Sequence, residues 1–263
     1  MKEETNFMGM KYGLAISELM DFFCEGEHQG FSEQDIQDAE QNIGAPLPAS
    51  YRSFLKSYGG DAINTHCHTI AKPENITTSY DCIEECITEE GGWQEEFEEA
   101  VKNGEESDYE DNEYFKLWQL PKEQWHTITE NYVLIWHENQ GVWCAGYLLK
   151  DLQADVTDPP VYISINDDFI SFEKYTPNTY LFLLEMLRQN AWGYHDGKRI
   201  WKKDEIRATL SSNNIVLEQL KHQYEIPEQK PLFYGTCLDD ETGTLYIYYA
   251  FNDEEELLIS PKI

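Results

Sequence analysis

Basic residues are scarce in this sequence. Its 263 residues include 19 lysines and arginines against 50 aspartates and glutamates, which gives a formal net charge of −31 at pH 7. A chain this acidic is repelled by the phosphate backbone of nucleic acids and by anionic membrane surfaces. We therefore exclude an ordinary nucleic-acid-binding protein, and the charge favours a basic partner, cations or simple solubility.

The sequence also lacks long apolar runs and closely spaced cysteines. The longest apolar runs, 180–184 and 245–251, are far shorter than the ~20 residues that span a bilayer. Acidic residues stand at the start of the chain, where a signal peptide needs positive charge. The six cysteines are too scattered for a disulfide scaffold. We expect a cytoplasmic protein with reduced thiols, whose 41% hydrophobic residues suffice for a sizeable core.

The motifs of common catalytic sites are also absent. His137 and Glu138 begin like the metalloprotease motif H-E-x-x-H, but Gly141 occupies the position of the second histidine. The sequence has no G-x-S-x-G, P-loop or G-x-G-x-x-G motif. We predict no enzyme. Because 50 acids place some carboxylates close together, a pair that performs acid–base catalysis stays open as an alternative.

One group of side chains has the types that bind zinc. Its members are His66, Cys67, His68, Cys82 and Cys86. Their spacing departs from the C-x₂-C pattern of a zinc site, and Cys82 and Cys86 lie one helical turn apart. Buried thiols and a polar loop account for these residues more simply, so we predict no metal and no cofactor.

Hydrophobic periodicity and capping residues predict the local structure. The expected helices cover residues 11–24, 33–43, 48–58 and 178–189. The expected strands cover residues 132–136, 142–149, 161–165, 232–237 and 245–251, with a turn at 138–141. Ser32 and Asp35 predict the N-cap of the second helix, and Gly44 suits its left-handed C-cap.

Residues 84–113 form an acidic segment in which Lys102 is the only base. The acids are Glu84, Glu85, Glu89, Glu90, Glu95, Glu96, Glu98, Glu99, Glu105, Glu106, Asp108, Glu110, Asp111 and Glu113. Trp93, Phe97 and Val101 share helical spacing, which predicts an amphipathic helix followed by a flexible stretch at 104–111. The segment is either a solvated face or a docking surface for a basic partner. Docking is favoured because aromatic residues are interleaved with the concentrated charge.

The docking hypothesis names a set of candidate partner-binding residues. They are Glu84, Glu85, Glu89, Glu90, Trp93, Glu95, Glu96, Glu98, Glu99, Asp108 and Asp111.

An ordered set of residues lies around the second and third expected helices: Glu40, Gly44, Leu47, Pro48, Tyr51, Phe54, Leu55, Gly59, Gly60 and Asp61. Their order and spacing resemble the signature of the SMI1/KNR4 (SUKH) superfamily. The apolar run at 132–136, Trp143 and the Asp-Pro-Pro sequence at 158–160 are similar to the family's central strands. The resemblance covers about residues 10–192. It implies an α+β fold with a mixed β-sheet flanked by helices, in which the motif residues build the fold.

The resemblance and the composition together predict the domain organisation. We expect an SMI1/KNR4-like domain over residues 1–193, with the acidic insert at about 84–113. A C-terminal helix and hairpin extension over residues 194–263 is expected to pack on the same domain. Neither the insert nor the extension resembles the family.

The resemblance also implies a function without catalysis. Many bacterial members look like immunity proteins, which bind and neutralise toxins of interbacterial competition, and others are regulatory scaffolds. We therefore expect a cytosolic immunity protein that occludes the active site of a basic toxin. A nuclease is the expected toxin, because its site must attract phosphates and an acidic surface reproduces their field. The alternatives are a regulatory scaffold and, less favoured, a hydrolase with an unrecognised carboxylate site.

Overall fold

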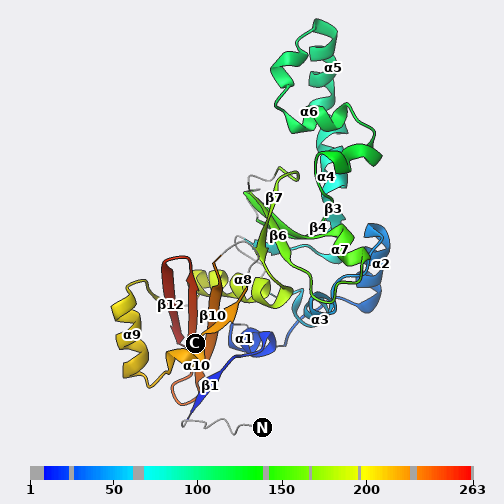
Figure 1. The fold of residues 1–263 in the computed structure, drawn as a ribbon. Helices are drawn as coiled ribbons and strands as arrows, with labels where there is room; N and C mark the ends of the chain where they lie inside the picture. Colours follow the sequence, from blue (N-terminus) through cyan, green and yellow to red (C-terminus); the bar gives the residue numbers. More distant parts are fainter. Residues whose placement is uncertain are drawn as a thin grey trace. The chain divides into compact units, whose positions relative to one another are not determined.

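The computed structural model describes residues 9–23, 27–61, 68–138, 142–165, 168–194, 197–225 and 230–261. The chain forms two compact units: a central unit of residues 28–179, and a terminal unit of residues 1–27 together with 180–263 (Figure 1). The α+β class is confirmed, because each unit combines helices with a β-sheet. The terminal unit combines both ends of the chain, because the strand Met10–Tyr12 pairs with the strand Leu232–Asp239.

Two helices of the central unit form as their capping residues predict. They are α2 (Glu33–Ile43) and α3 (Ala49–Tyr58). The Ser32 hydroxyl accepts the backbone N–H of Asp35 in a capping box, and Gly44 ends α2 with a left-handed φ of 70°. One face of each helix is buried in the core. These buried residues are Ile36, Ala39, Ile43, Tyr51, Phe54 and Leu55.

The sheet of the central unit has six strands. They are β2 (His68–Ile70), β3 (Thr77–Thr78), β4 (Tyr132–Glu138), β5 (Trp143–Leu148), β6 (Val161–Ile165) and β7 (Phe172–Thr176). Their order is β2-β4-β5-β6-β7, and β3 also pairs with β4. The resemblance implies a mixed sheet, whereas every pairing among the described strands is antiparallel.

The sheet and α3 share a buried contact between two tyrosines. The rings of Tyr51 in α3 and Tyr147 in β5 lie edge to face, with 5.9 Å between their centroids. The Tyr51 hydroxyl donates to the carbonyl of Ile135 at 2.9 Å. Near this contact β4 carries a bulge, and a Cβ on Gly146 would lie 2.4 Å from the carbonyl oxygen of Val133. Glycine is therefore required at this close approach of two strands.

Between β3 and β4 the chain forms a helical arm, residues 79–127. Its elements are α4 (Ser79–Thr88), α5 (Trp93–Asn103), the 3₁₀ helix η3 (Glu106–Tyr109), α6 (Glu113–Trp118) and the 3₁₀ helix η4 (Lys122–Thr127). From β3, α4 leads away from the sheet of the central unit toward α5 and α6 (Figure 1). The central unit also contains the 3₁₀ helix η2 (Pro73–Asn75) and the short helix α7 (Leu149–Gln153).

The terminal unit contains a second antiparallel sheet. Its strands are β1 (Met10–Tyr12), β8 (Lys198–Ile200), β9 (His222–Tyr224), β10 (Leu232–Asp239), β11 (Thr244–Phe251) and β12 (Glu254–Pro261). Their order is β1-β10-β11-β12-β8, with β9 also on β10. The expected hairpin of residues 232–237 and 245–251 is confirmed as β10 and β11.

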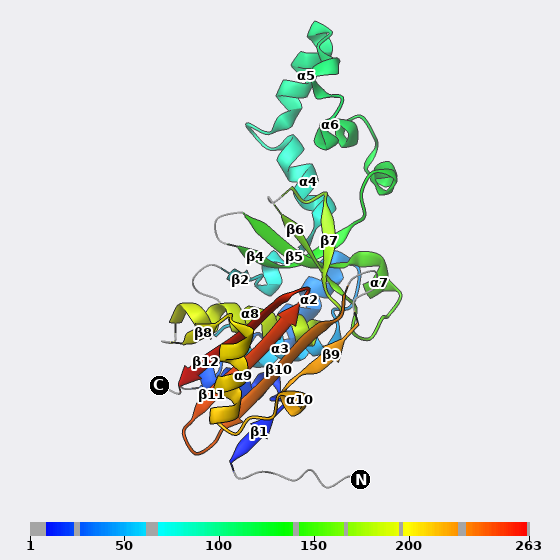
Figure 2. The same cartoon turned by 60° about the vertical axis from the view of Figure 1, so that its left-hand side comes forward.

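Helices cover both faces of this sheet (Figure 2). They are α1 (Ile16–Phe23), α8 (Thr179–Tyr194), α9 (Lys203–Ser212) and α10 (Leu217–Leu220). On one face, Ile206 and Leu210 of α9 pack with Tyr248 and Leu257 of the sheet. Toward α8, the Tyr234 hydroxyl donates to the carbonyl of Leu184 at 3.3 Å.

Several expectations differ from the structure or lie outside it. The helix expected over 11–24 is shorter, because Lys11 and Tyr12 pair with β10 as part of β1. His66, Cys67 and the turn residues 139–141 lie outside the described residues. Among the helices that the structure describes, none is long and apolar enough to cross a membrane.

Candidate partner-binding surface

The base of the helical arm is a hydrophobic cluster that fixes α4 to its neighbours. The buried members of the cluster are Ile83, Ile87, Leu117, Trp125 and Ile170. The indole N–H of Trp125 donates to the carbonyl of Leu117 at 2.9 Å, which closes the connection between α6 and η4. The α4 N-terminus is capped by the hydroxyl of Thr78, which accepts the backbone N–H of Asp81.

Hydrogen bonds attach the same base to the rest of the central unit. The Tyr80 hydroxyl donates to the carbonyl of Thr129 at 2.6 Å, and the Thr129 hydroxyl donates to the carbonyl of Ile170 at 2.6 Å. Tyr114 of α6 donates to the carbonyl of Asp168 in the connection between β6 and β7, at 2.5 Å. The arm is therefore an ordered extension of the sheet and not a loose loop.

A second cluster, made of aromatic rings, holds α5, η3 and α6 together. Phe97 is its centre and is fully buried. The centroid of its ring lies 5.7 Å from that of Trp93, 5.5 Å from Tyr109, 5.1 Å from Phe115 and 5.6 Å from Trp118. The Trp93 side of the cluster faces solvent, because Trp93 is 38% exposed. Phe97 is thus part of the arm's own core, and Trp93 is the ring of the pair that a partner can reach.

The expected flexible stretch at 104–111 is instead ordered. Gly104 ends α5 in the left-handed conformation, with a φ of 74°. η3 follows and brings Tyr109 against Phe97. The Tyr109 hydroxyl donates to the carboxylate of Glu96 at 2.5 Å, and this hydrogen bond raises the pKa of the phenol. The charged residues of this stretch therefore have defined positions.

The acids of the segment all point to solvent. Each of the fourteen named above is exposed. Two of the candidate acids, Glu84 and Glu85, lie on α4, and Glu89 and Glu90 follow that helix. Four lie on α5, namely Glu95, Glu96, Glu98 and Glu99. Asp108 lies in η3, and Asp111 follows η3. All eleven candidate residues thus belong to the arm, including Trp93.

One candidate acid has a basic neighbour. The ammonium group of Lys122 donates to Glu84 at 2.6 Å and to Asp81 at 2.9 Å. Burial lowers the pKa of Lys122, but the hydrogen bonds to the two carboxylates outweigh it and raise the pKa overall. Part of the negative charge at the base of the arm is therefore neutralised, whereas α5 carries four glutamates with Lys102 as its single base.

The residues of the family signature hold the turns around α2 and α3. The carboxylate of Glu40 accepts the backbone N–H of Leu47 at 2.7 Å and also contacts the guanidinium of Arg52. Asp61, 7% exposed, accepts the backbone N–H of Gln29 at 2.5 Å and contacts Nδ1 of His28 at 2.7 Å. These partly buried polar contacts fix backbone positions, in keeping with a role in building the fold.

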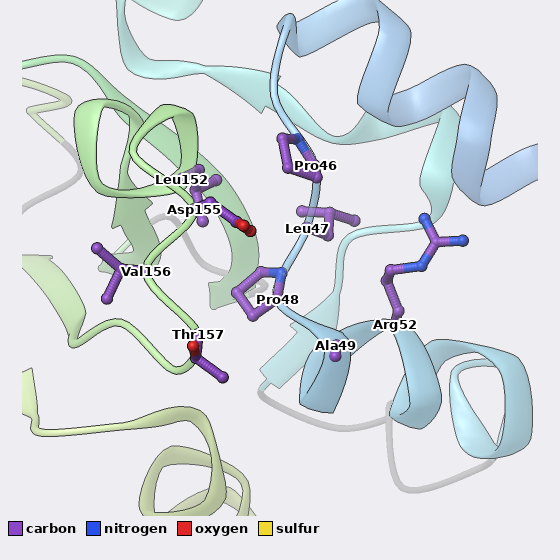
Figure 3. A pocket seen from close by; sticks show the side chains of 9 residues that line it. All are labelled: Pro46, Leu47, Pro48, Ala49, Arg52, Leu152, Asp155, Val156 and Thr157. Carbon is purple, nitrogen blue, oxygen red and sulfur yellow. The ribbon is translucent and has the colours of Figure 1, made fainter.

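A small pocket opens beside this signature, between the α2–α3 connection and the residues that follow α7 (Figure 3). Its volume is about 190 Å³. The lining residues are Pro46, Leu47, Pro48, Ala49, Arg52, Leu152, Asp155, Val156 and Thr157. This pocket could not be predicted from the sequence, because its two walls lie about 100 residues apart in the chain.

A known protein family matches the part of the chain that contains the signature and the arm. The profile of the SUKH_6 family, described as SMI1-KNR4 cell-wall, matches residues 33–183, more than half of the chain. The chain belongs to the SMI1-KNR4 family. The match begins at α2 and ends within α8, so it covers the signature, the helical arm and the sheet of the central unit. No curated protein matches the chain.

Outside the family match, the SMI1-KNR4 chain contains a buried charged cluster. Arg188 of α8 contacts Glu185 of the same helix and Glu256 of β12. Arg199 of β8 reaches the same Glu256, with 2.7 Å between Nε and Oε1. The guanidinium of Arg188 also lies over the ring of Tyr249, 4.7 Å from its centroid. Sequence patterns could not find this cluster, because three distant elements supply it.

The zinc-type residues of this SMI1-KNR4 protein are described only in part. Cys82 and Cys86 lie half-buried on α4, while His66 and Cys67 fall outside the described residues. Within the described part of the chain, no three His, Cys, Asp or Glu side chains are placed to hold a metal ion together.

Proposed function

We propose that this SMI1-KNR4 protein is an immunity protein, which binds a basic protein toxin and covers its active site with the helical arm. The observation that carries the proposal is the arm: it bears fourteen exposed carboxylates, and its elements α5, η3 and α6 share an aromatic core. The family supports the proposal, because its members are often immunity proteins and are generally not catalysts. A nuclease fits best as the toxin, since its substrate site must attract phosphate groups.

The ordered arm suits this mechanism in two ways. First, its helices are formed before binding, so less conformational entropy is lost when a partner docks. Second, concentrated charge of one sign speeds encounters with a partner of the opposite sign. Steered association reaches ~10⁸–10⁹ M⁻¹s⁻¹ at low salt, against ~10⁵–10⁶ M⁻¹s⁻¹ without steering.

The direct test combines protection of cells with binding kinetics. The protein would be produced together with toxins encoded beside its gene, and the surviving cells counted. For the toxin that it neutralises, the association rate constant would be measured at 0.01 M and 0.15 M salt. The Debye length falls from ~30 Å to ~8 Å over this range, so association should slow steeply.

Two variants with equal changes of charge locate the binding surface. Replacing Glu95, Glu96, Glu98 and Glu99 of α5 with glutamine should slow association and flatten its salt dependence. The matched control replaces four exposed glutamates elsewhere in the chain with glutamine, namely Glu74, Glu173, Glu241 and Glu254. We expect the control to associate nearly as fast as the unchanged protein. Equal effects of both variants would show that net charge, and not the arm, governs binding.

A further inference from the structure

The pocket beside the family signature has apolar walls and a charged rim (Figure 3). Leu47 and Leu152 form its buried floor, with 3% and 2% exposure. Pro46 and Val156 stand at the rim, where Val156 is 42% exposed. These surfaces match the aliphatic part of a side chain and leave its polar end near solvent.

Of the two charged residues that line the pocket, Arg52 already has partners. Its guanidinium contacts the carboxylates of Glu40 and Glu33, which both lie on α2. Figure 3 shows the guanidinium turned toward α2 and away from Asp155. Because Glu33 also pairs with Lys56, the two carboxylates balance two basic side chains. Arg52 therefore offers an anion no unpaired positive charge.

Asp155 supplies the charge that remains. It is exposed, and among the described residues none forms a hydrogen bond or ion pair with its carboxylate. Its backbone is left-handed, with a φ of 54°, and Figure 3 shows the carboxylate directed toward the wall formed by Leu47 and Pro48. A conformation that few residues other than glycine, asparagine and aspartate adopt readily thus places a carboxylate at the mouth of an apolar pocket.

We propose that this pocket receives an arginine side chain of the basic partner. The stem of the arginine would pack on Pro46, Pro48 and Val156, and its guanidinium would meet the carboxylate of Asp155. Arginine fits better than lysine, because a planar guanidinium bonds a carboxylate through two N–H groups and stacks on flat apolar surfaces. The inference rests on the proposed function in one respect, which is that the partner is basic.

The test uses a small probe, so that it does not depend on identifying the partner. The ¹⁵N-labelled protein would be titrated with N-acetyl-arginine N-methylamide while amide signals are followed by NMR. We expect saturable shifts at Leu47, Ala49, Val156 and Thr157, with a dissociation constant in the millimolar range that is usual for such small ligands. The citrulline analogue, which has the same shape without the charge, should bind about three- to fivefold more weakly.

Two variants complete the design. Asp155→Asn removes the charge but keeps a residue that adopts the left-handed conformation, so it should weaken the arginine probe to the level of the citrulline analogue. The control Asp204→Asn, at an exposed position of α9 in the terminal unit, should leave the titration unchanged. The inference is overturned if the probe causes no localised shifts, if citrulline binds equally well, or if inorganic phosphate binds in the pocket instead. These results leave the proposed function standing, because the α5 variant tests the arm separately.

Discussion

The hydroxyl of Tyr114 donates a hydrogen bond to the backbone carbonyl of Asp168, with 2.5 Å between the two oxygen atoms. Tyr114 lies in α6 of the arm, and Asp168 lies between β6 and β7 of the sheet. The ring of Tyr114 also stacks with Trp93, with 6.2 Å between the centroids. One side chain therefore connects the exposed end of the aromatic cluster to the sheet, in addition to the connection through α4.

The first prediction concerns this connection. Tyr114→Phe keeps the ring and its stacking but removes the hydrogen bond, which should cost about 1 kcal/mol of stability. Amide hydrogen exchange should become faster in residues 113–118, whereas β4 and β5 should keep their protection. Equal acceleration in the arm and the sheet would show that the bond contributes to the whole unit and does not specifically hold the arm.

The second prediction separates two stacked aromatic residues. Phe97→Ala truncates the fully buried centre of the cluster and should cost about 3–5 kcal/mol in denaturant unfolding. Trp93→Ala should cost clearly less, because Trp93 is 38% exposed. The effects on binding should have the opposite order. If the Trp93 ring is an interface anchor, Trp93→Ala should raise the dissociation rate constant more than Phe97→Ala does. A Trp93→Ala variant as unstable as Phe97→Ala would contradict this assignment.

The third prediction concerns the buried charged cluster of the terminal unit. Arg188→Met leaves Glu185 and Glu256 buried without their main cationic partner, which should cost about 3–5 kcal/mol. In that variant Glu256 keeps, among the described residues, only Arg199 as a basic partner, so adding Glu256→Gln removes one excess negative charge and should restore part of the loss. Urea denaturation of the single and double variants measures the coupling. Strictly additive losses would mean that the two residues act independently.

The fourth prediction follows from an ion pair on the same sheet. Two N–H groups of Arg207 in α9 donate to Glu255 of β12, at 2.5 and 2.9 Å, and hold the pKa of Glu255 below its ordinary value of 4.5. A lowered carboxyl pKa stabilises the fold above pH 4.5, and this contribution is lost as pH falls through the folded-state pKa. In Arg207→Gln, an NMR titration should show the pKa of Glu255 rising, and stability should depend less on pH in that window. An unchanged pKa would exclude Arg207 as the cause.

Local structure could be predicted wherever neighbouring residues determine it. The start and end of α2 depend on Ser32, Asp35 and Gly44, all within one helix and its caps, and these predictions are confirmed. The same holds for the hairpin of β10 and β11, whose two strands are joined by a short turn. In the acidic segment, the spacing of Trp93 and Phe97 correctly indicated a helix, α5.

Features that depend on distant residues could not be predicted. The short strands β1 and β8 are defined by pairing with β10 and β12, and nothing in their own sequences distinguishes them. The pocket likewise needs two segments that only the fold brings together. No glycine stands at the left-handed position of Asp155, and the prolines at 159 and 160 come too late to indicate the turn that directs its carboxylate. The arm shows an intermediate case, because composition revealed its charge but not its aromatic core.

The pairing of β1 with β10 has a consequence for how the chain folds during synthesis. β1 leaves the ribosome early, but its partner β10 is made only after the entire central unit. Residues 28–179 can therefore begin to fold before β10, the pairing partner of β1, has been synthesised. The terminal sheet can be completed only after β10, β11 and β12 have been synthesised. A chain that lacked these three strands would also leave β1 without its pairing partner, β10.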